Sequence, residues 1–245
     1  MLSIQNLHKN FGGVRAVDGC SFDVKAGTIT ALIGPNGSGK TTVFNLVCGV
    51  LQPDSGKIVF SGKQISKLKP ETISNLGISR LFQQARLFGN LTVRENMLIA
   101  FDNEDTKFLK NFFGMNPISK EKEAKAREVL KTIGMERFEN KQARDLSYGQ
   151  KRLVELARAM INPHKLLMLD EPVAGVNPKL RKEIAGLLLK LKKQGETVFL
   201  IEHDMNFTLG IADTVVVMDE GKVIAEGTPQ KIKKNPKVLE AYLGE

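Results

Sequence analysis

Residues Gly34 to Thr41 form the segment of this 245-residue chain with the clearest chemistry. They spell GPNGSGKT, which fits the spacing GxxxxGK[ST], and they follow an apolar run, Thr28–Ile33, and precede a helical stretch from Thr42 to Cys48. Glycines let the backbone turn tightly so that consecutive N–H groups point at one phosphate chain, and a helix N-terminus adds favourable partial charge. Strand, loop and helix in this order predict that the chain binds a nucleoside triphosphate.

Individual side chains in this loop have chemistry suited to phosphate and to its counterion. Lys40 would bring a full positive charge to the terminal phosphates, and the hydroxyl of Thr41 is placed to ligate Mg²⁺. The residues expected to bind nucleotide here are Gly34, Pro35, Asn36, Gly37, Ser38, Gly39, Lys40, Thr41 and Thr42.

A second segment ends an apolar strand in two acids. Leu166–Leu169 is followed directly by Asp170 and Glu171. In an open α/β sheet, ligands lie beyond the carboxyl ends of the strands. We therefore expect Asp170 to hold Mg²⁺, directly or through water, and Glu171 to orient or polarise the attacking water. Acids in such loops are often helix caps or surface charges, and the phosphate loop in the same chain favours the functional interpretation.

The elements that must position these residues follow from apolar periodicity. Strand-like runs form an N-terminal β layer, a helical pattern follows from Thr92 to about Met160, and strand and helix alternate from Leu166 onwards. This alternation implies right-handed crossovers and a mainly parallel sheet. We predict an α/β fold, a P-loop NTPase core with a mainly parallel sheet, an N-terminal antiparallel β layer and an inserted helical lobe. The expected core is residues 1–90 and 162–245, and the lobe is about 91–161, within a single domain.

Composition sets limits on location and partners. Hydrophobic residues make up 42% and charged residues 26% of the chain. The net charge of +9 admits nucleic acid or an anionic membrane surface as a neighbour but requires neither, because the lysines are spread among acids along helical faces, and no nucleic-acid partner is expected. Cys20 and Cys48 lack a metal or redox spacing and are expected to be free thiols in a reducing compartment. No apolar stretch approaches the ~18–20 residues that span a bilayer, and the N-terminus lacks a signal-peptide core. We expect a cytosolic protein.

Three further motifs resemble those of ATP-binding-cassette (ABC) proteins. The string Leu146-Ser147-Tyr148-Gly149-Gln150 resembles the LSGGQ signature, Gln83 resembles the Q-loop glutamine, and His203 resembles the switch histidine. Phe11 lies where this family places an aromatic residue that stacks on adenine. In this order the motifs cover the chain from Phe11 to His203, and the resemblance implies an ABC ATPase with ATP and Mg²⁺ as cofactors.

The resemblance also implies a role for each matching residue. Ser147, besides its chemistry as a helix N-cap, would face the γ-phosphate of ATP held by another copy, together with Gly149 and Gln150. The implied catalytic residues are Glu171, His203 and Gln83, and the implied Mg²⁺ ligands are Thr41, Gln83 and Asp170.

Departures from the common motifs point to one branch of the family. Tyr148 replaces the usual Gly of the signature, and this change, the segment Val173–Pro178 and the C-terminal string GTPQKIKKNPKVLEAYLGE are similar to branched-chain amino-acid importers. Asn177 occupies the usual Asp position of the D-loop, and its effect on communication between two ATP sites stays open. The implied function is ATP hydrolysis that powers import of branched-chain amino acids. Alternatives are the same motor for urea or amide import or lipopolysaccharide export, or a non-transport ABC ATPase.

The resemblance implies an assembly as well. Its expected partners are a second ABC ATPase subunit, identical or paralogous, transmembrane permease subunits and, indirectly, a substrate-binding protein. The expected location is cytoplasmic and peripheral on the inner face of the cell membrane. The segment Phe112–Pro117 breaks the helical pattern, and its aromatic residues either dock a partner or hold a loop on the lobe.

Overall fold

The computed structural model describes residues 1–81, 87–101, 120–161 and 163–243. The chain forms two compact units. Unit 1 comprises Met1–Arg80, His164–Ala174 and Arg181–Glu245, and unit 2 comprises Leu81–Pro163 and Gly175–Leu180. Within the described ranges, none of the helices combines the length and the apolar character needed to cross a bilayer. The segment Phe112–Pro117 lies outside the described residues.

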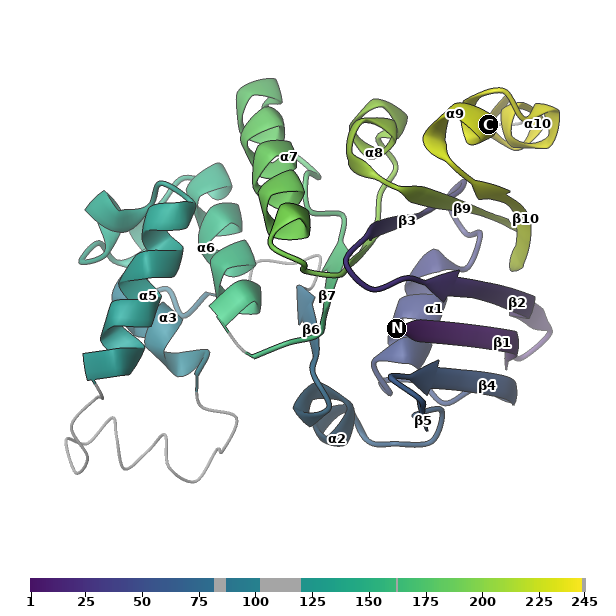
Figure 1. Ribbon diagram of the computed structural model, residues 1–245, viewed down its shortest axis with the longest axis horizontal. Helices are drawn as coiled ribbons and strands as arrows, with labels where there is room; N and C mark the ends of the chain where they lie inside the picture. Colours follow the sequence, from purple (N-terminus) through teal and green to yellow (C-terminus); the bar gives the residue numbers. More distant parts are fainter. Residues whose placement is uncertain (82–86, 102–119, 162, 244–245) are drawn as a thin grey trace. The chain divides into compact units, whose positions relative to one another are not determined.

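The smaller sheet of unit 1 is antiparallel, in agreement with the predicted N-terminal β layer (Figure 1). Its strands pair in the order β2-β1-β4-β5. Leu2 of β1 lies opposite Val24 of β2 on one side and opposite Phe60 of β4 on the other, and all of these side chains are buried. The strands are β1 (Leu2–Phe11), β2 (Val14–Val24), β4 (Ser55–Phe60) and β5 (Lys63–Gln64).

The larger sheet has six strands in the order β10-β9-β3-β8-β7-β6. Strand β3 pairs parallel with β8 and β9, β8 pairs parallel with β7, and β10 runs antiparallel to β9. Every residue of β3, β7 and β8 is buried, as expected for parallel strands covered on both faces. The predicted fold class is confirmed. The strands are β3 (Ile29–Ile33), β6 (Ile78–Leu81), β7 (Leu166–Asp170), β8 (Val198–Ile201), β9 (Thr214–Asp219) and β10 (Lys222–Gly227).

Helix α1 (Lys40–Val47) belongs to the hydrophobic core shared by the two sheets. The ring of Phe199 on β8 has its centroid 4.7 Å from that of Phe44 on α1 and 5.6 Å from that of Phe22 on β2. Because side chains alternate across a strand, Met168 and Ile201 join this core while Leu167 and Leu200 point to the opposite face. The phosphate loop thus precedes a helix that is held on two sides by packed side chains.

The other helices of unit 1 follow the strands in sequence. In α7, Ile184, Leu188 and Leu191 recur at three- and four-residue spacing and are buried. The helices are α2 (Pro70–Asn75), α7 (Pro178–Lys193, whose first residues belong to unit 2), α8 (Met205–Ile211), α9 (Pro229–Lys233) and α10 (Pro236–Leu243).

Unit 2 is helical in its described part. Thr92 and Glu95 form a reciprocal capping box at the start of α3: the Glu95 N–H donates to Thr92 Oγ1 at 3.1 Å, and the Thr92 N–H donates to Glu95 Oε2 at 2.7 Å. Asn96 is fully buried and accepts a hydrogen bond from the Phe88 N–H at 2.9 Å. The elements are α3 (Val93–Ile99), α5 (Lys120–Thr132), η1 (Glu136–Phe138), η2 (Ala143–Asp145) and α6 (Tyr148–Ile161).

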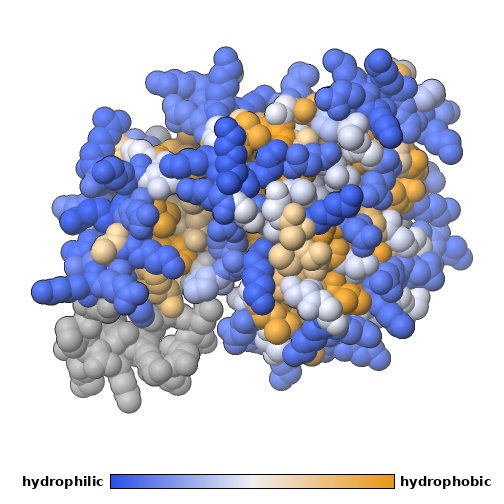
Figure 2. All heavy atoms as spheres, viewed as in Figure 1, coloured by the Kyte–Doolittle hydropathy of each residue, from blue (hydrophilic) through white to orange (hydrophobic). Residues whose placement is uncertain are grey.

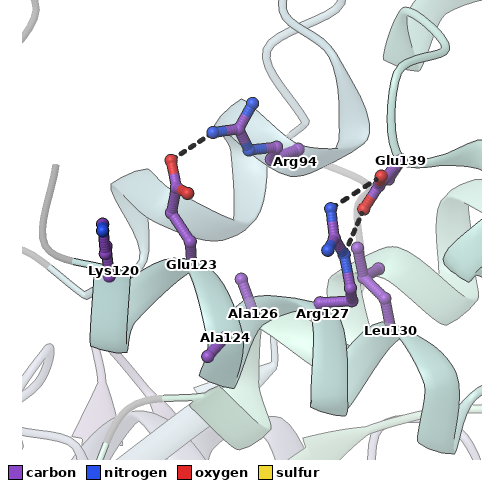
Figure 3. Close-up of a pocket in the computed structure, with 8 residues that line it drawn as sticks. All are labelled: Arg94, Lys120, Glu123, Ala124, Ala126, Arg127, Leu130 and Glu139. Atoms are coloured by element: carbon purple, nitrogen blue, oxygen red, sulfur yellow. Dashed lines mark hydrogen bonds and ion pairs between the residues drawn. The ribbon is translucent and has the colours of Figure 1, made fainter.

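Charged side chains surround a hollow beside α3 and α5 in unit 2 (Figure 3). Arg94 of α3 forms an ion pair with Glu123 of α5, and Arg127 donates to both carboxylate oxygens of Glu139 at 3.1 Å. These pairs tie α5 to α3 and to the residue that follows η1. Figure 2 shows hydrophilic side chains over much of the displayed face, with smaller hydrophobic patches between them.

Candidate functional site

The phosphate loop lies so close to neighbouring backbone that only glycine fits at two of its positions. A Cβ added to Gly34, whose φ is 150°, would lie 2.0 Å from the carbonyl oxygen of Met218 in β9. A Cβ added to Gly39, whose φ is 100°, would lie 2.2 Å from the carbonyl oxygen of Ala16 in β2. Both sheets therefore shape the loop, and the glycines are required by contact as well as by conformation.

Lys40 is held inside this loop. Its Nζ donates to the carbonyl oxygens of Gly34 at 2.8 Å and Pro35 at 2.7 Å, and it lies 3.2 Å from Oγ of Ser38. The residue is only 5% exposed. Because three protein oxygens already fix the ammonium group, its charge is placed before any phosphate arrives, and little side-chain entropy remains to be lost on binding.

The remaining loop residues divide between an accessible tip and a packed base. Asn36, Gly37 and Thr41 are exposed, whereas Ser38 is buried and its carbonyl oxygen accepts from the Gly221 N–H at 3.1 Å. The loop thus presents its tip and the first turn of α1 to solvent. A helix N-terminus in this setting favours an anion.

Asp170 ends β7 in a buried polar cluster that sequence reasoning did not anticipate. Arg80 of β6 donates through Nη2 to Oδ2 of Asp170 at 2.8 Å and through Nη1 to Oδ1 of Asn45 at 2.7 Å. The side chains of Arg80 and Asp170 are only 7% and 4% exposed. The guanidinium compensates the buried carboxylate and joins β7 to α1.

This cluster bears on whether the predicted Mg²⁺ ligands fit that ion. Asn45 follows Thr41 by about one turn of α1, so the shared contact with Arg80 brings the Asp170 carboxylate against the helix that carries Thr41. A hydroxyl and a carboxylate are hard oxygen donors, and Mg²⁺ commonly uses one or two such ligands together with substrate phosphates and water. Thr41 and Asp170 fit the ion in the chemistry of their donor atoms, and Arg80 links Asp170 to the helix that carries Thr41.

Glu171 and His203 form the shortest contact among the predicted catalytic residues. The imidazole Nε2 of His203 lies 2.5 Å from Oε1 of Glu171. When Glu171 is ionised, the imidazole tautomer with its proton on Nε2 donates this hydrogen bond. Glu171 has a φ of 49°, a left-handed conformation that non-glycine residues keep only when their surroundings impose it. Its N–H donates to the Ile201 carbonyl oxygen at 3.0 Å, which extends the pairing of β7 with β8.

Glu202, next to His203, is a second buried acid that sequence reasoning gave no role. Its Oε1 accepts from the Val173 N–H at 3.0 Å, and its Oε2 accepts from the His203 N–H at 3.2 Å. Burial raises the pKa of this carboxyl, and the backbone donors partly oppose that shift. The carboxylate therefore bridges the loop after β7 and the turn after β8.

The signature residues lie in unit 2 and cap α6. The Gln150 N–H donates to Oγ of Ser147 at 3.3 Å, and the Ser147 N–H donates to Oε1 of Gln150 at 3.0 Å. This is the N-cap chemistry expected of Ser147. A Cβ on Gly149 would lie 2.6 Å from Cδ2 of Leu180, and a Cβ on Gly175 would lie 3.4 Å from the Tyr148 ring. Tyr148 is 53% exposed and covers Gly175, which gives the aromatic residue a packing partner in this chain.

Two further predicted residues complete the comparison with the sequence. Phe11 ends β1 with 46% of its surface exposed, and Nζ of Lys9 lies 5.6 Å from its ring centroid. An exposed ring suits a stacking role, which stays a prediction. Gln83 lies outside the described residues. Unit 1 thus holds the phosphate loop, Asp170, Glu171 and His203, and unit 2 holds the signature residues.

Arg80, Asn45 and Glu202 are the polar residues of this site that the sequence did not reveal. Signals for two of them were present. Arg80 is a charged residue in a short strand, β6, whose residues Ile78 and Leu81 are buried. Glu202 directly follows the apolar strand β8, in the same way that Asp170 stands at the end of β7. An acid at a strand end beside a phosphate loop therefore warrants attention even outside a known motif.

Family models match most of the chain. The family described as ABC transporter matches residues 17–174, and the one described as branched-chain amino acid ATP-binding cassette transporter matches residues 222–245. Together the two matches include the phosphate loop, the signature segment and the C-terminal helices.

Full-length relatives and solved structures agree with these matches. The high-affinity branched-chain amino acid transport ATP-binding protein BraF of Pseudomonas aeruginosa is 41% identical over 251 residues, covering 100% of this chain and 98% of BraF. The ADP conformation of the ATP-binding cassette MJ1267 has a TM-score of 0.88 and 36% identity, covering 100% of this chain and 99% of that one. A dimeric post-hydrolysis structure of the cassette MJ0796, bound to ADP and Pi, has a TM-score of 0.79 and 27% identity, covering 94% and 99%.

Proposed function

The chain belongs to the ABC transporter family, and we propose that it is the ATP-hydrolysing subunit of a transporter that imports branched-chain amino acids. The observation that carries the catalytic part of the proposal is the 2.5 Å contact between Glu171 and His203, directly after the buried Asp170. A carboxylate whose backbone and hydrogen-bond partner are both fixed is suited to orient a water molecule rather than to cap a helix.

The proposed chemistry divides among the residues of unit 1. Lys40 and the N-terminus of α1 stabilise negative charge on the phosphates, and Glu171 accepts a hydrogen bond from the attacking water. His203 donates to Glu171 and holds its carboxylate in place. Mg²⁺, held by Thr41 and Asp170 and, by family resemblance, Gln83, would neutralise charge that develops on the phosphates. Phe11 would stack on the adenine.

The proposal includes a shared ATP site. A helix N-terminus capped by Ser147 favours an anion, and the exposed residues Ser147 and Tyr148 leave this end of α6 accessible in unit 2. We propose that Ser147, Gly149 and Gln150 face the γ-phosphate held by a second cassette, identical or paralogous. The cassette MJ0796, which is dimeric in a post-hydrolysis state with ADP and Pi, supports the pairing of two cassettes. The subunit would bind transmembrane permeases at the inner face of the cell membrane, with a substrate-binding protein delivering cargo to them.

Support for the cargo comes from the relatives and from the C-terminal family match. BraF is named for branched-chain amino acid transport, and residues 222–245 match the corresponding C-terminal family. Permease and binding subunits select cargo, so the direct test is genetic. Deleting the gene should abolish uptake of labelled leucine, and restoring the wild-type chain, but not the E171Q variant, should recover it.

The hydrolytic role is tested by Glu171→Gln against a control with the same backbone constraint. Glu220 also has a positive φ, 44°, and is exposed in the turn between β9 and β10, so E220Q controls for the backbone. E171Q should bind ATP with wild-type affinity and lose nearly all turnover, whereas E220Q should retain both. Hydrolysis by E171Q at the wild-type rate would remove Glu171 from the catalytic role.

A further inference from the structure

Glu202 connects the two segments that carry the catalytic pair, and we propose that it is a positioning residue that fixes Glu171 against His203. The proposal deepens the function proposed above and rests on the same site. Glu202 itself is turned away from solvent, being only 3% exposed, so it acts on the reaction through its neighbours rather than on the nucleotide.

The carboxylate uses a different oxygen for each segment. Oε1 accepts from the N–H of Val173, two residues after Glu171, at 3.0 Å. Oε2 accepts from the N–H of His203 at 3.2 Å. A single rigid group thus sets the distance between the backbone after β7 and the backbone after β8. The first of these segments carries Glu171 and the second carries His203, and the side chains of these two residues are in contact.

The loop after β7 has little other freedom once this bridge is made. Glu171 is in the left-handed conformation, its N–H donates to Ile201, and its carbonyl oxygen accepts from the Ala174 N–H at 3.1 Å. The turn is therefore fixed at both ends by backbone bonds, and Glu202 holds Val173 between them. Without the bridge, nothing among these described bonds joins Val173 to the turn that carries His203.

A second contact, an ion pair, joins α7 to the turn after β8. Arg181 of α7 pairs with Asp204, whose other carboxylate oxygen accepts from the Phe207 N–H at 2.9 Å and caps α8. Within unit 1, Val173 is thus bonded to Glu202, and Arg181 is paired with Asp204. Of these two contacts, the one made by Glu202 lies nearer in sequence to Glu171.

The carboxyl group of Glu202 is costly to bury but offers two acceptor oxygens, which supports its role as a bridge. Burial raises the pKa of Glu202 and the nearby charge of Glu171 adds to that effect, while the backbone donors of Val173 and His203 oppose it because they bind the ionised carboxylate. Two acceptors with fixed spacing are what a bridge between backbone N–H groups requires.

Glu202→Gln tests the bridge with little change in volume, because the amide keeps one acceptor but turns an NH₂ group toward a backbone donor. Glu202→Asp keeps the charge but shortens the reach. The matched control is Glu183→Gln on an exposed position of α7. The chain has only three histidines, so ¹⁵N-imidazole NMR separates His203 from His8 and His164 without any need for turnover.

In E202Q we expect the His203 ring signals to move toward those of E171Q, the His8 and His164 signals to stay in place, and ATP affinity to be unchanged. Turnover should fall about 10- to 100-fold at constant KM, since small misplacements of catalytic groups cost that much. E202D should lie between wild type and E202Q, and E183Q should match wild type in every measurement. If E202Q shows unchanged His203 signals, or loses turnover only through unfolding that also shifts His8 and His164, the positioning role is wrong. A wild-type chain that binds ATP without hydrolysing it would overturn the proposed function, and the NMR comparison would still decide on the bridge.

Discussion

Replacing Arg80 with Met would leave the buried carboxylate of Asp170 without its guanidinium partner. The wild-type side chains are 7% and 4% exposed and lie 2.8 Å apart, and the guanidinium also holds Asn45 at 2.7 Å. Removing one partner of a buried ion pair typically destabilises a protein by about 3–5 kcal/mol. In a chain of this size each kcal/mol lowers the Tm by about 2–4 °C, so R80M should melt about 6–20 °C below wild type.

The assay is thermal unfolding of R80M, D170N and the double variant R80M/D170N, with R15M as the control. Arg15 pairs with Asp18 at 3.7 Å but is 75% exposed, and such a pair contributes about 0–1 kcal/mol. The double variant should recover part of the stability lost in R80M, because it removes the uncompensated charge. Mg²⁺ with nucleotide should raise the Tm of R80M more than that of wild type, since the cation supplies charge beside Asp170.

Two results would refute this reasoning. A Tm of R80M within the range of the R15M control would show that the buried pair contributes no more than a surface pair. Strict additivity of the R80M and D170N effects would show that the two side chains are not coupled.

Three other outcomes follow from the same site. Lys40→Ala should weaken ATP binding roughly ten- to hundred-fold, because charge-assisted contacts worth ~1.5–3 kcal/mol are lost. Unchanged ATP affinity measured by calorimetry would contradict the assignment of this loop to phosphate binding. Gly34→Ala should lower both the Tm and nucleotide affinity, because its Cβ would lie 2.0 Å from the Met218 carbonyl oxygen, and wild-type behaviour in both assays would count against the packing argument. The pKa of Glu202 is raised above its ordinary 4.5, so its contribution to stability is fully present below that pH and is lost as pH rises through the folded-state value. In urea unfolding, the free energy of unfolding of wild type should therefore fall relative to that of E202Q as pH rises from about 4.5 to 8. A difference between the two that stays constant with pH would argue against the raised pKa.

Much of the fold was predictable from local pattern because the core strands are short, apolar and bounded by turns. Strands β3 and β7 were expected almost to the residue, as Thr28–Ile33 and Leu166–Leu169. The bounds of strand β1, which runs from Leu2 to Phe11, were harder to predict, because its outer half pairs with β2 through an irregular register that carries no clean alternation. Strand β6 was missed because a buried arginine interrupts its apolar pattern.

The site was predictable where chemistry lies in a contiguous motif. The loop from Gly34 to Thr41 and the pair Asp170–Glu171 were identified from spacing and context, and the structure brings Glu171 to His203 over a separation of 32 residues. The bridge made by Glu202 and the contact of Arg80 with Asn45 depend on which strands lie side by side. The strand order β8-β7-β6 is set by tertiary packing, and the sequence pattern of a single segment does not predict it.

The most direct test of the central claim, that ATP is hydrolysed at a site shared by two cassettes, is a mixing experiment with two defective variants. K40A impairs the phosphate loop in unit 1 and leaves Ser147 intact, whereas S147R places a bulky cation at the start of α6 in unit 2 and leaves Lys40 intact. A mixed dimer would contain one site with both a sound phosphate loop and a sound signature. We predict that each variant alone is inactive and that an equimolar mixture regains about a quarter of wild-type ATPase activity, since half of the dimers are mixed and each has one intact site. A mixture no more active than the sum of its components, alongside an active wild-type protein, would contradict the shared site.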